Sequence, residues 1–588
     1  MRIALLTEGG YPYATGASHA WCDRLVRGLT SHDFAVYALT THPRQETGHP
    51  PALPAHARLA HTAPLWGAFP EAHRRAAEER RGRLCKRRER RLFAEHFGAL
   101  AAALTWERPP GTGPGDGPMI DKADRFAAGL YGLADLARSH GRLPRLLRSE
   151  DAVRILQAAC RGPRALPAAH GAPLRDLLTV TEHLERALRP LSLDWYGPAP
   201  GGLDGADLCH AAAGGAAALP GLLAKRFFGT PLLVTEYGVR LREHYLARAT
   251  APLTAPVRAL LAAFQRALAA EIYAQAALIT PGNTHARRWQ LRCGADPARL
   301  RTVYEGMDAT AFAAVGDTAA HDSKTLVWVG ALTPDKDIVG LLHAFADIRR
   351  AEPEAALRII GTTGGPRSPA YRAQCQALAA QLFPDEAADD RTAGENPVSF
   401  EEVGEPDVPT LADAYAAGAV LVLSSVVEGF PRSLVEAMFA GRATVSTDAG
   451  AVCEVIGGTG LVVPPRNPRA LAESCRALLA DPGRRARLGA AARARALELF
   501  TVEQNIAAFR GIYLELISHA PGRPAAAEGA PRPFDSPAES HVPGRWAAAP
   551  VGHTPSWAAG EERTDDEEMA GAAAAPTAVP SAGRGEGS

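Results

Sequence analysis

The segment LVLSSVVEGFPRSLVEAMFAG, residues 421–441, decides the fold. It opens with an apolar run that ends at Ser424, passes through a short loop, and continues with residues spaced for an amphipathic helix. Pro431 is typical of a helix start and Gly441 of a helix end. A strand that leads directly into a helix indicates an open α/β sheet, and such sheets bind ligands at the carboxyl ends of their strands. We therefore expect a binding site at this loop.

Two carboxylates mark the expected site. Glu428 lies in the loop, and Glu436 lies in the helix eight positions later. Carboxylates accept hydrogen bonds from vicinal hydroxyls of a sugar or ribose, and a helix N-terminus suits a phosphate. Two glutamates at this spacing also occur on ordinary solvated helices, so the preceding strand and the intervening Gly429, Phe430 and Pro431 carry the inference. The pattern predicts a ligand that combines sugar and phosphate, as a nucleotide-sugar does.

The run EGFPRSLVE resembles the signature of glycosyltransferase family 4, a retaining family of the GT-B fold. The resemblance implies an α/β protein of two Rossmann-like domains that face each other across a cleft. It implies that Glu428 faces the donor sugar as a catalytic residue and that Glu436 binds the nucleotide ribose. Gly429, Phe430 and Pro431 would touch sugar and diphosphate. The donor would be a nucleotide-sugar, with a UDP-sugar expected, and neither a metal nor another cofactor would be required.

A second segment, WVGALTPDKD at 328–337, resembles the family stretch that carries Gly-Arg and then Lys. Gly330 and Lys336 match, and Ala331 stands where the family has Arg. The resemblance implies that Lys336 neutralises the leaving diphosphate; a solvated loop lysine is the alternative. One cation instead of two would weaken donor binding and leaving-group stabilisation.

The N-terminal half resembles the corresponding domain of PelF-like exopolysaccharide glycosyltransferases. In the loop EGGYPYATGASHAW, residues 8–21, Gly16 would let the backbone approach donor phosphate and acceptor, whereas Ala17 replaces a second glycine. In PLLVTEYG, residues 231–238, Tyr237 stands where the resemblance implies His, and tyrosine cannot take a positive charge. A plain strand–helix turn and a half-buried tyrosine are the alternatives for these positions.

Strands alternate with helices along most of the chain, which predicts parallel sheets built from right-handed βαβ units. Residues dense in Arg and Ala with helical spacing interrupt the pattern. We expect an acceptor-side domain at 1–298 with a helical insertion at about 65–195, a donor-side domain at 299–519, and a tail at 520–588. Residues 299–305 are expected to form a strand that closes the first half, and the last helix, at 501–518, to cross back to the first domain. The tail holds too little apolar pattern to offset the entropy of ordering, so we expect it to be disordered.

Composition sets further bounds on the 588 residues. The 64 basic and 64 acidic residues balance, so nothing indicates a nucleic-acid partner. Eight cysteines include no Cys-x-x-Cys pair, and Cys22, Cys85 and Cys453 lie in apolar segments, which favours buried thiols in a cytoplasmic, reducing compartment. No apolar run is long enough for a membrane span. The basic run at 74–91 is either a solvated helical face or a peripheral membrane contact.

The sequence therefore predicts a retaining glycosyltransferase that moves a hexosyl group from a nucleotide-sugar to a glycan or another hydroxyl acceptor. Two alternatives stay open. Ala17, Tyr237 and Ala331 together favour a catalytically weak protein that senses a glycan or nucleotide-sugar. A sugar-nucleotide epimerase or a glycogen synthase-like enzyme would share the GT-B layout.

Overall fold

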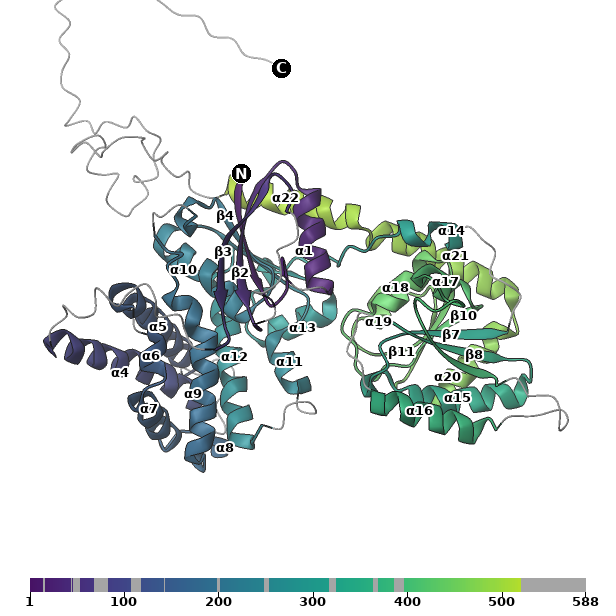
Figure 1. Cartoon of the computed structure of the whole chain (residues 1–588), viewed down its shortest axis with the longest axis horizontal. Coiled ribbons are helices and arrows are strands. Elements are labelled where there is room, and N and C mark those ends of the chain that lie inside the picture. Colours follow the sequence, from purple (N-terminus) through teal and green to yellow (C-terminus); the bar gives the residue numbers. More distant parts are fainter. Residues whose placement is uncertain are drawn as a thin grey trace, which may run out of the picture. The chain divides into compact units, whose positions relative to one another are not determined.

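The computed structural model describes residues 1–13, 16–43, 45, 53–67, 83–106, 118–141, 143–197, 201–247, 253–316, 324–362, 369–384 and 396–519 (Figure 1). The predicted disordered tail and residues 74–82 of the basic run at 74–91 lie outside the described residues.

The first sheet has six parallel strands in the order β3-β2-β1-β4-β5-β6. The strands are β1 (Arg2–Glu8), β2 (Asp33–Thr40), β3 (Ala57–Pro64), β4 (Leu208–Ala211), β5 (Leu232–Glu236) and β6 (Leu278–Pro281). Most of these strands are apolar on both faces because helices cover both sides of a parallel sheet. The sequence did not predict β3, whose residues ARLAHTAP contain neither Val nor Ile and only partly bury their side chains.

The second sheet repeats the plan in the order β12-β11-β10-β7-β8-β9, with every pairing parallel. The strands are β7 (Thr325–Gly330), β8 (Ala356–Gly361), β9 (Val398–Glu402), β10 (Val420–Leu423), β11 (Ala443–Thr447) and β12 (Leu461–Val463). Strand order reverses between β7 and β10, so their carboxyl ends form the switch point at which such sheets bind ligands. The two parallel six-stranded sheets confirm the predicted pair of Rossmann-like units.

Helices fill the region between β3 and β4. They are α4 (Arg83–Thr105), α5 (Pro118–His140), α6 (Leu143–Leu147), α7 (Glu150–Cys160), α8 (Pro167–His170) and α9 (Leu174–Leu188). Their buried side chains share one apolar cluster with β1, β2 and the long helix α12 (Ala255–Gln275). The buried Arg189 fastens them to the sheet, because it pairs with Glu185 at 2.7 Å and donates to the carbonyl oxygens of Trp66 and Gly67 beyond the end of β3.

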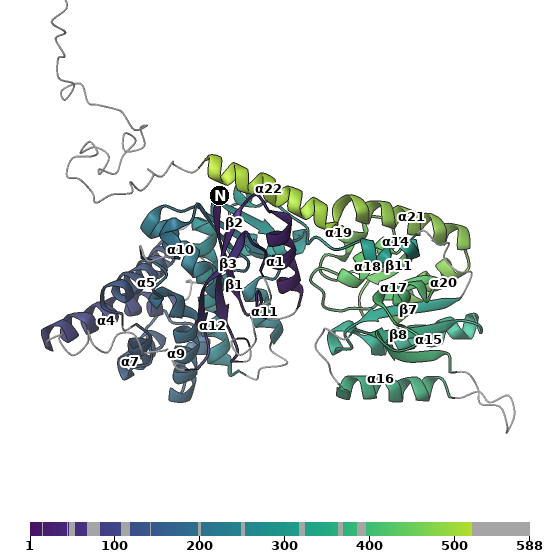
Figure 2. The same cartoon turned by 45° about the horizontal axis from the view of Figure 1, so that its top comes forward.

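The remaining longer helices connect successive strands or follow the last one. They are α1 (Ala17–Gly28), α10 (Leu219–Phe228), α11 (Arg240–Leu246), α13 (Thr284–Arg292), α15 (Ile338–Ala351), α16 (Pro369–Leu382), α18 (Arg432–Phe439), α20 (Pro468–Leu479), α21 (Pro482–Leu499) and α22 (Val502–Ser518). Helix α22 contacts α1 (Figure 2). Its Phe509 and Tyr513 share an apolar cluster with Trp21 and with strands of the first sheet, so the chain returns to its N-terminal half after the second sheet.

Two sequence predictions were wrong. Residues 299–305 do not form a strand; the N–H groups of Arg301 and Val303 donate to carbonyls of β6, but only Leu300 makes a bridge before the chain departs. Cys453 is exposed rather than buried, because the short helix α19 (Val452–Ile456) turns its valines and isoleucine inward and Cys453 outward. Cys22 is buried as predicted, and the Cys85 side chain lies outside the described residues.

Candidate functional site

The site begins where β10 ends. Lys336, which follows β7, donates from Nζ to Oε2 of Glu428 at 2.6 Å, although 92 residues separate the two. The same carboxylate accepts from Ser425 Oγ at 3.0 Å and from the Gly429 N–H at 3.2 Å. The side chains of Lys336 and Glu428 are 20% and 11% exposed, so solvent screens their attraction only in part. The structure thus brings together the two residues predicted to be catalytic.

Hydroxyl side chains hold the neighbouring strand ends in register. Ser424 Oγ donates to the carbonyl of Lys336 at 2.7 Å, and Thr447 Oγ1, at the end of β11, donates to the carbonyl of Ser425 at 2.6 Å. The sequence analysis missed the positioning role of all three hydroxyl residues. Their only signal is that each occurs at or just beyond the end of a strand.

Gly450 holds the backbone of the Glu428 loop from the other side. Its φ is +61°, and a Cβ atom there would lie 2.4 Å from the carbonyl oxygen of Glu428. The N–H of Ala451 donates to the carbonyl of Gly429 at 3.0 Å. Only glycine permits this approach without strain, so Gly450 is a positioning residue that the sequence analysis did not identify.

Glu436 lies on α18, which begins at Arg432 and is followed by Gly441 in the left-handed region, as predicted. It accepts a hydrogen bond of 2.7 Å from the hydroxyl of Tyr415. Burial raises the pKa of Glu436, and Glu305 adds to the rise, whereas Tyr415 and Arg432 oppose it. Arg432 also pairs with the buried Glu305. The second signature carboxylate is therefore held in place by neighbours and is largely shielded from water.

The residues between the two glutamates have different surroundings. A Cβ atom on Gly429 would meet nothing within 4 Å, so the backbone there is open to a ligand. Phe430 packs its ring 5.9 Å from that of Phe500, and Pro431 is buried at the position before the first turn of α18. Gly330, at the end of β7, lies close enough to the ring of Trp328 that a Cβ would be 3.2 Å from it.

Predicted positions in the first half lie in other environments. Gly16 precedes α1 with φ +135°, and no hydrogen bond among the described residues joins it to the Glu428 loop. The Tyr237 hydroxyl accepts from Nδ2 of Asn505 on α22 at 3.4 Å, and its ring lies against the edge of Trp21. A role of Gly16 toward the donor stays a prediction.

Two buried titratable residues lie at strand ends of the first sheet. His210 bonds to the Tyr513 hydroxyl at 2.7 Å and to Thr235 Oγ1 at 2.6 Å, and burial lowers its pKa to about 3. Glu236 accepts from Tyr273 and from Gln290, and burial raises its pKa to about 7. Burial favours the neutral form of both groups. From the sequence, Glu236 was noted only as a match to the family pattern beside Tyr237, and His210 was not singled out.

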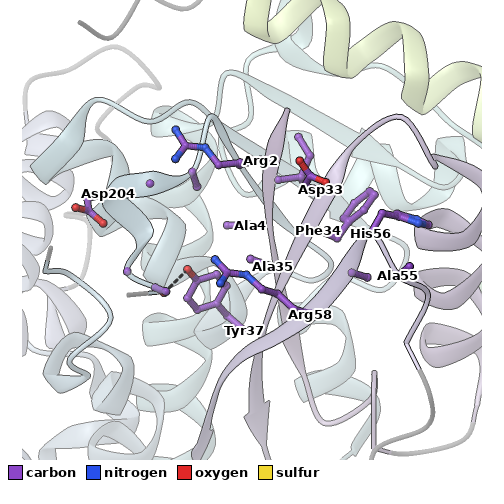
Figure 3. A pocket seen from close by; sticks show the side chains of 16 residues that line it. Arg2, Ala4, Asp33, Phe34, Ala35, Tyr37, Ala55, His56, Arg58 and Asp204 are labelled. Carbon is purple, nitrogen blue, oxygen red and sulfur yellow. Dashed lines mark hydrogen bonds between the residues drawn. The ribbon is translucent and has the colours of Figure 1, made fainter. Parts of the chain in front are cut away.

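A cavity of about 430 Å³ lies elsewhere, at the amino-terminal ends of β1 and β2 (Figure 3). Alanines and glycines line much of it, and Arg2, Arg58, Asp33 and Asp204 carry its charges. The Tyr37 hydroxyl donates to the carbonyl of Gly201 at 2.6 Å and holds the covering loop. No residue predicted for the site lines this cavity.

The described residues contain neither a metal-binding cluster nor a membrane-spanning helix. These residues include no group of three or more His, Cys, Asp or Glu side chains placed to hold a metal ion. Within the same part of the chain, every helix is too short or too polar to cross a bilayer.

The arrangement of two parallel sheets is the GT-B fold of glycosyltransferases. The chain aligns with HepE of Anabaena in complex with UDP at a TM-score of 0.50 and 14% identity, over 88% of this chain and all of that one. Residues 1–298 match the family model described as Domain of unknown function (DUF3492), and the chain belongs to that family. Residues 323–481 match the model described as Glycosyl transferases group 1.

Curated relatives match part of the chain. The D-inositol 3-phosphate glycosyltransferase of Kineococcus radiotolerans is 34% identical over 236 residues, which cover 36% of this chain and 52% of that protein. The enzyme of the same name from Nocardioides sp. is 27% identical over 289 residues, covering 46% and 59%. The chain thus spans about half the length of the curated relatives it matches.

Proposed function

We propose that the protein is a retaining glycosyltransferase that transfers a hexosyl group from a nucleotide-sugar, with a UDP-sugar expected, to a hydroxyl group of a glycan or another acceptor. The observation that carries the proposal is the Lys336–Glu428 pair at the switch point of the second sheet, with Glu436 on the helix that follows. The match of this half to Glycosyl transferases group 1 supports it. The relatives named as D-inositol 3-phosphate glycosyltransferases agree with glycosyl transfer, and the UDP complex of HepE agrees with a donor of this class.

In the proposed reaction each part of the site meets one part of the donor. Glu436, oriented by Tyr415, accepts hydrogen bonds from the ribose hydroxyls. The diphosphate lies over the open backbone of Gly429 near Lys336, and Glu428 faces the sugar. The bond between the anomeric carbon and the phosphate oxygen breaks, the acceptor oxygen attacks from the same face, and its proton passes to the departing phosphate. Lys336 and the N-terminus of α18 stabilise the charge that develops on that phosphate. No step requires a metal ion.

The proposal extends to the division of labour along the chain. Residues 299–519 hold the donor, and residues 1–298 read the acceptor. A PelF-like role in exopolysaccharide synthesis and a cytoplasmic location belong to the same proposal. They are supported by the residues in the first half that resemble that family and by the six buried free thiols among the described cysteines.

Two observations favour a second candidate, a sensor that binds nucleotide-sugar without turning it over. Ala331 contributes no charge beside Lys336, and Tyr237, at the position where the resemblance implies His, cannot take a positive charge. Both would reduce catalysis more than donor binding.

The test is a purified full-length chain incubated with a panel of nucleotide-sugars and simple glycan acceptors. We expect release of nucleoside diphosphate from at least one donor, and a product whose anomeric configuration by NMR matches the donor. Donor binding without release would establish the sensor. Conversion of the nucleotide-sugar to an epimer without acceptor would establish the epimerase alternative. Absence of both binding and turnover would contradict a donor site.

A further inference from the structure

The charges beside the Glu428 loop nearly cancel in the structure. Lys336 is the cation that follows β7, and its ammonium is already paired with the Glu428 carboxylate. Ala331, five residues earlier, contributes no charge. A nucleoside diphosphate brings several negative charges, and in a partly buried site these need charge-assisted donors. The loop therefore lacks excess positive charge from its own half of the chain.

Arg242 brings a positive charge to this loop from the first half. It lies on α11, and its Nη2 donates to the carbonyl oxygen of Glu428 at 2.6 Å. Among the described residues Arg242 makes no ion pair, so its contact with the loop is to a neutral acceptor. Burial lowers its pKa, while Glu243 and Glu428 raise it, and arginine stays charged at any physiological pH.

Arg242 and two further arginines act together on His285. Burial lowers the pKa of His285, at the start of α13, and Arg242, Arg288 and Arg292 lower it further, whereas Glu454 raises it. The Nε2 atom of His285 is buried and has no hydrogen-bond partner. Arg242 is thus the member of a basic group on α11 and α13 that is in direct contact with the Glu428 loop.

We propose that Arg242 supplies the second positive charge for the donor diphosphate, in the place that Ala331 leaves without one. The inference rests on the proposed function of the loop. Arg242 and Lys336 contact two atoms of the same residue, the carbonyl oxygen and the carboxylate of Glu428, so a diphosphate placed over Gly429 lies within reach of both. A phosphate is a stronger acceptor for guanidinium than a carbonyl oxygen is, so bound donor would draw Arg242 from Glu428 to itself.

The experiment compares calorimetric binding of UDP and UMP to the full-length chain and to Arg242→Gln. Glutamine keeps an N–H donor for the Glu428 carbonyl but carries no charge. We expect UDP to bind about tenfold more weakly, or worse, with little change for UMP, because only the second phosphate loses a charged partner. Arg242→Lys should retain most of the UDP affinity. Arg226→Gln, which removes an equal charge paired with Asp135 on the helical region, is the matched control and should bind both nucleotides as the native chain does.

A rescue variant completes the test. Ala331→Arg in the Arg242→Gln background should restore much of the lost UDP affinity, because it returns the charge from the second half.

Unchanged UDP affinity in Arg242→Gln would overturn the inference. Equal losses for UDP and UMP would overturn it too, because Arg242 would then only hold the two halves together. A native chain that binds neither nucleotide would overturn the proposed function together with the inference. A native chain that binds both while Arg242→Gln does so equally would overturn the inference alone.

Discussion

Both sheets carry titratable side chains at the carboxyl ends of neighbouring strands. Those of the second sheet form an ion pair, whereas those of the first sheet are buried and favour their neutral forms. At the carboxyl ends of β7 and β10, Lys336 and Glu428 are ionised partners that still reach solvent. At the ends of β4 and β5, His210 and Glu236 are fully enclosed, and burial favours the neutral form of both. A ligand could therefore reach the charged groups of the second sheet, whereas the titratable groups of the first sheet are buried in its core.

Helix α22 accounts for much of this difference. Its Tyr513 bonds to His210, its Phe509 packs against both His210 and Trp21, and its Asn505 accepts from the Trp21 indole at 3.3 Å. Lys336, by contrast, keeps 20% of its side chain exposed, and its ammonium pairs with the Glu428 carboxylate. A domain that docks its last helix on the strand ends of a sheet seals them, because aromatic burial removes the water that ionised groups need.

The largest expected effect is that of Lys336, at the strand ends of the second sheet. Lys336→Ala should lower the kcat of sugar transfer by about 10²–10³-fold, since it removes the charge that meets the departing diphosphate. Lys324→Ala is the matched control, because that lysine pairs with Glu352 at the surface and should leave kcat unchanged. Steady-state kinetics with the best donor of the panel would measure it. A similar small loss in both variants would refute the role of Lys336.

The next largest effect concerns Glu236, at the end of β5 in the first sheet. The folded chain raises the pKa of Glu236 from its ordinary 4.5 to about 7, so between these values the folded state holds a proton that the unfolded state lacks. The contribution of this raised pKa to the stability of the folded chain is complete below pH 4.5 and is lost as the pH rises through 7. Between pH 4.5 and 8 the native chain should therefore lose about 3 kcal/mol of unfolding free energy relative to Glu236→Gln.

Denaturant unfolding of both proteins across that pH range would check this prediction. Glu473→Gln, which removes an exposed carboxylate paired with Arg469 on α20, serves as the control and should follow the native curve. Parallel curves for Glu236→Gln and the native chain would mean that Glu236 is ionised in the folded protein.

A smaller effect is expected at Glu436. Glu436→Ala should weaken binding of a nucleoside diphosphate by about 1–3 kcal/mol, because the ribose hydroxyls lose a buried acceptor. Tyr415→Phe removes only the hydrogen bond that orients this carboxylate and should cost about 0.5–1.5 kcal/mol. Calorimetry would rank the two, and a larger loss for Tyr415→Phe would contradict direct contact of Glu436 with the nucleotide.

The smallest effect concerns the C-terminal segment. A chain truncated after Ala520 should keep its melting temperature and its donor affinity, because residues 520–588 carry little apolar pattern. Thermal unfolding with and without UDP would detect a role if there is one. A drop of several degrees in the truncated chain would show that the segment contributes to the fold.

The sequence predicted the fold around the Glu428 loop well because its signals are local. The strand, the loop glycine and the helix all lie within the 21 residues 421–441, so element type and position could be read together. The ion pair between Glu428 and Lys336 was not predicted, although the sequence placed each residue after a strand of the second sheet.

Contacts between segments that are distant in the sequence could not be predicted from it. Nothing in the residues around Arg242 indicates that its guanidinium meets the Glu428 carbonyl 186 positions later. Gly450 is one glycine among 56, and only the folded backbone reveals the close approach that requires it. The segment RLRTVYE at 299–305 resembled a strand, yet its pairing with β6 ends after two backbone hydrogen bonds.

A crystal structure of the full-length chain with UDP would test the central claim most directly. We predict the ribose on Glu436, the diphosphate over Gly429 beside Lys336, and the Arg242 guanidinium moved from the Glu428 carbonyl to a phosphate oxygen. UDP bound elsewhere, such as in the cavity between Arg2 and Arg58 at the far end of the first sheet, with the Glu428 loop unchanged, would contradict the account.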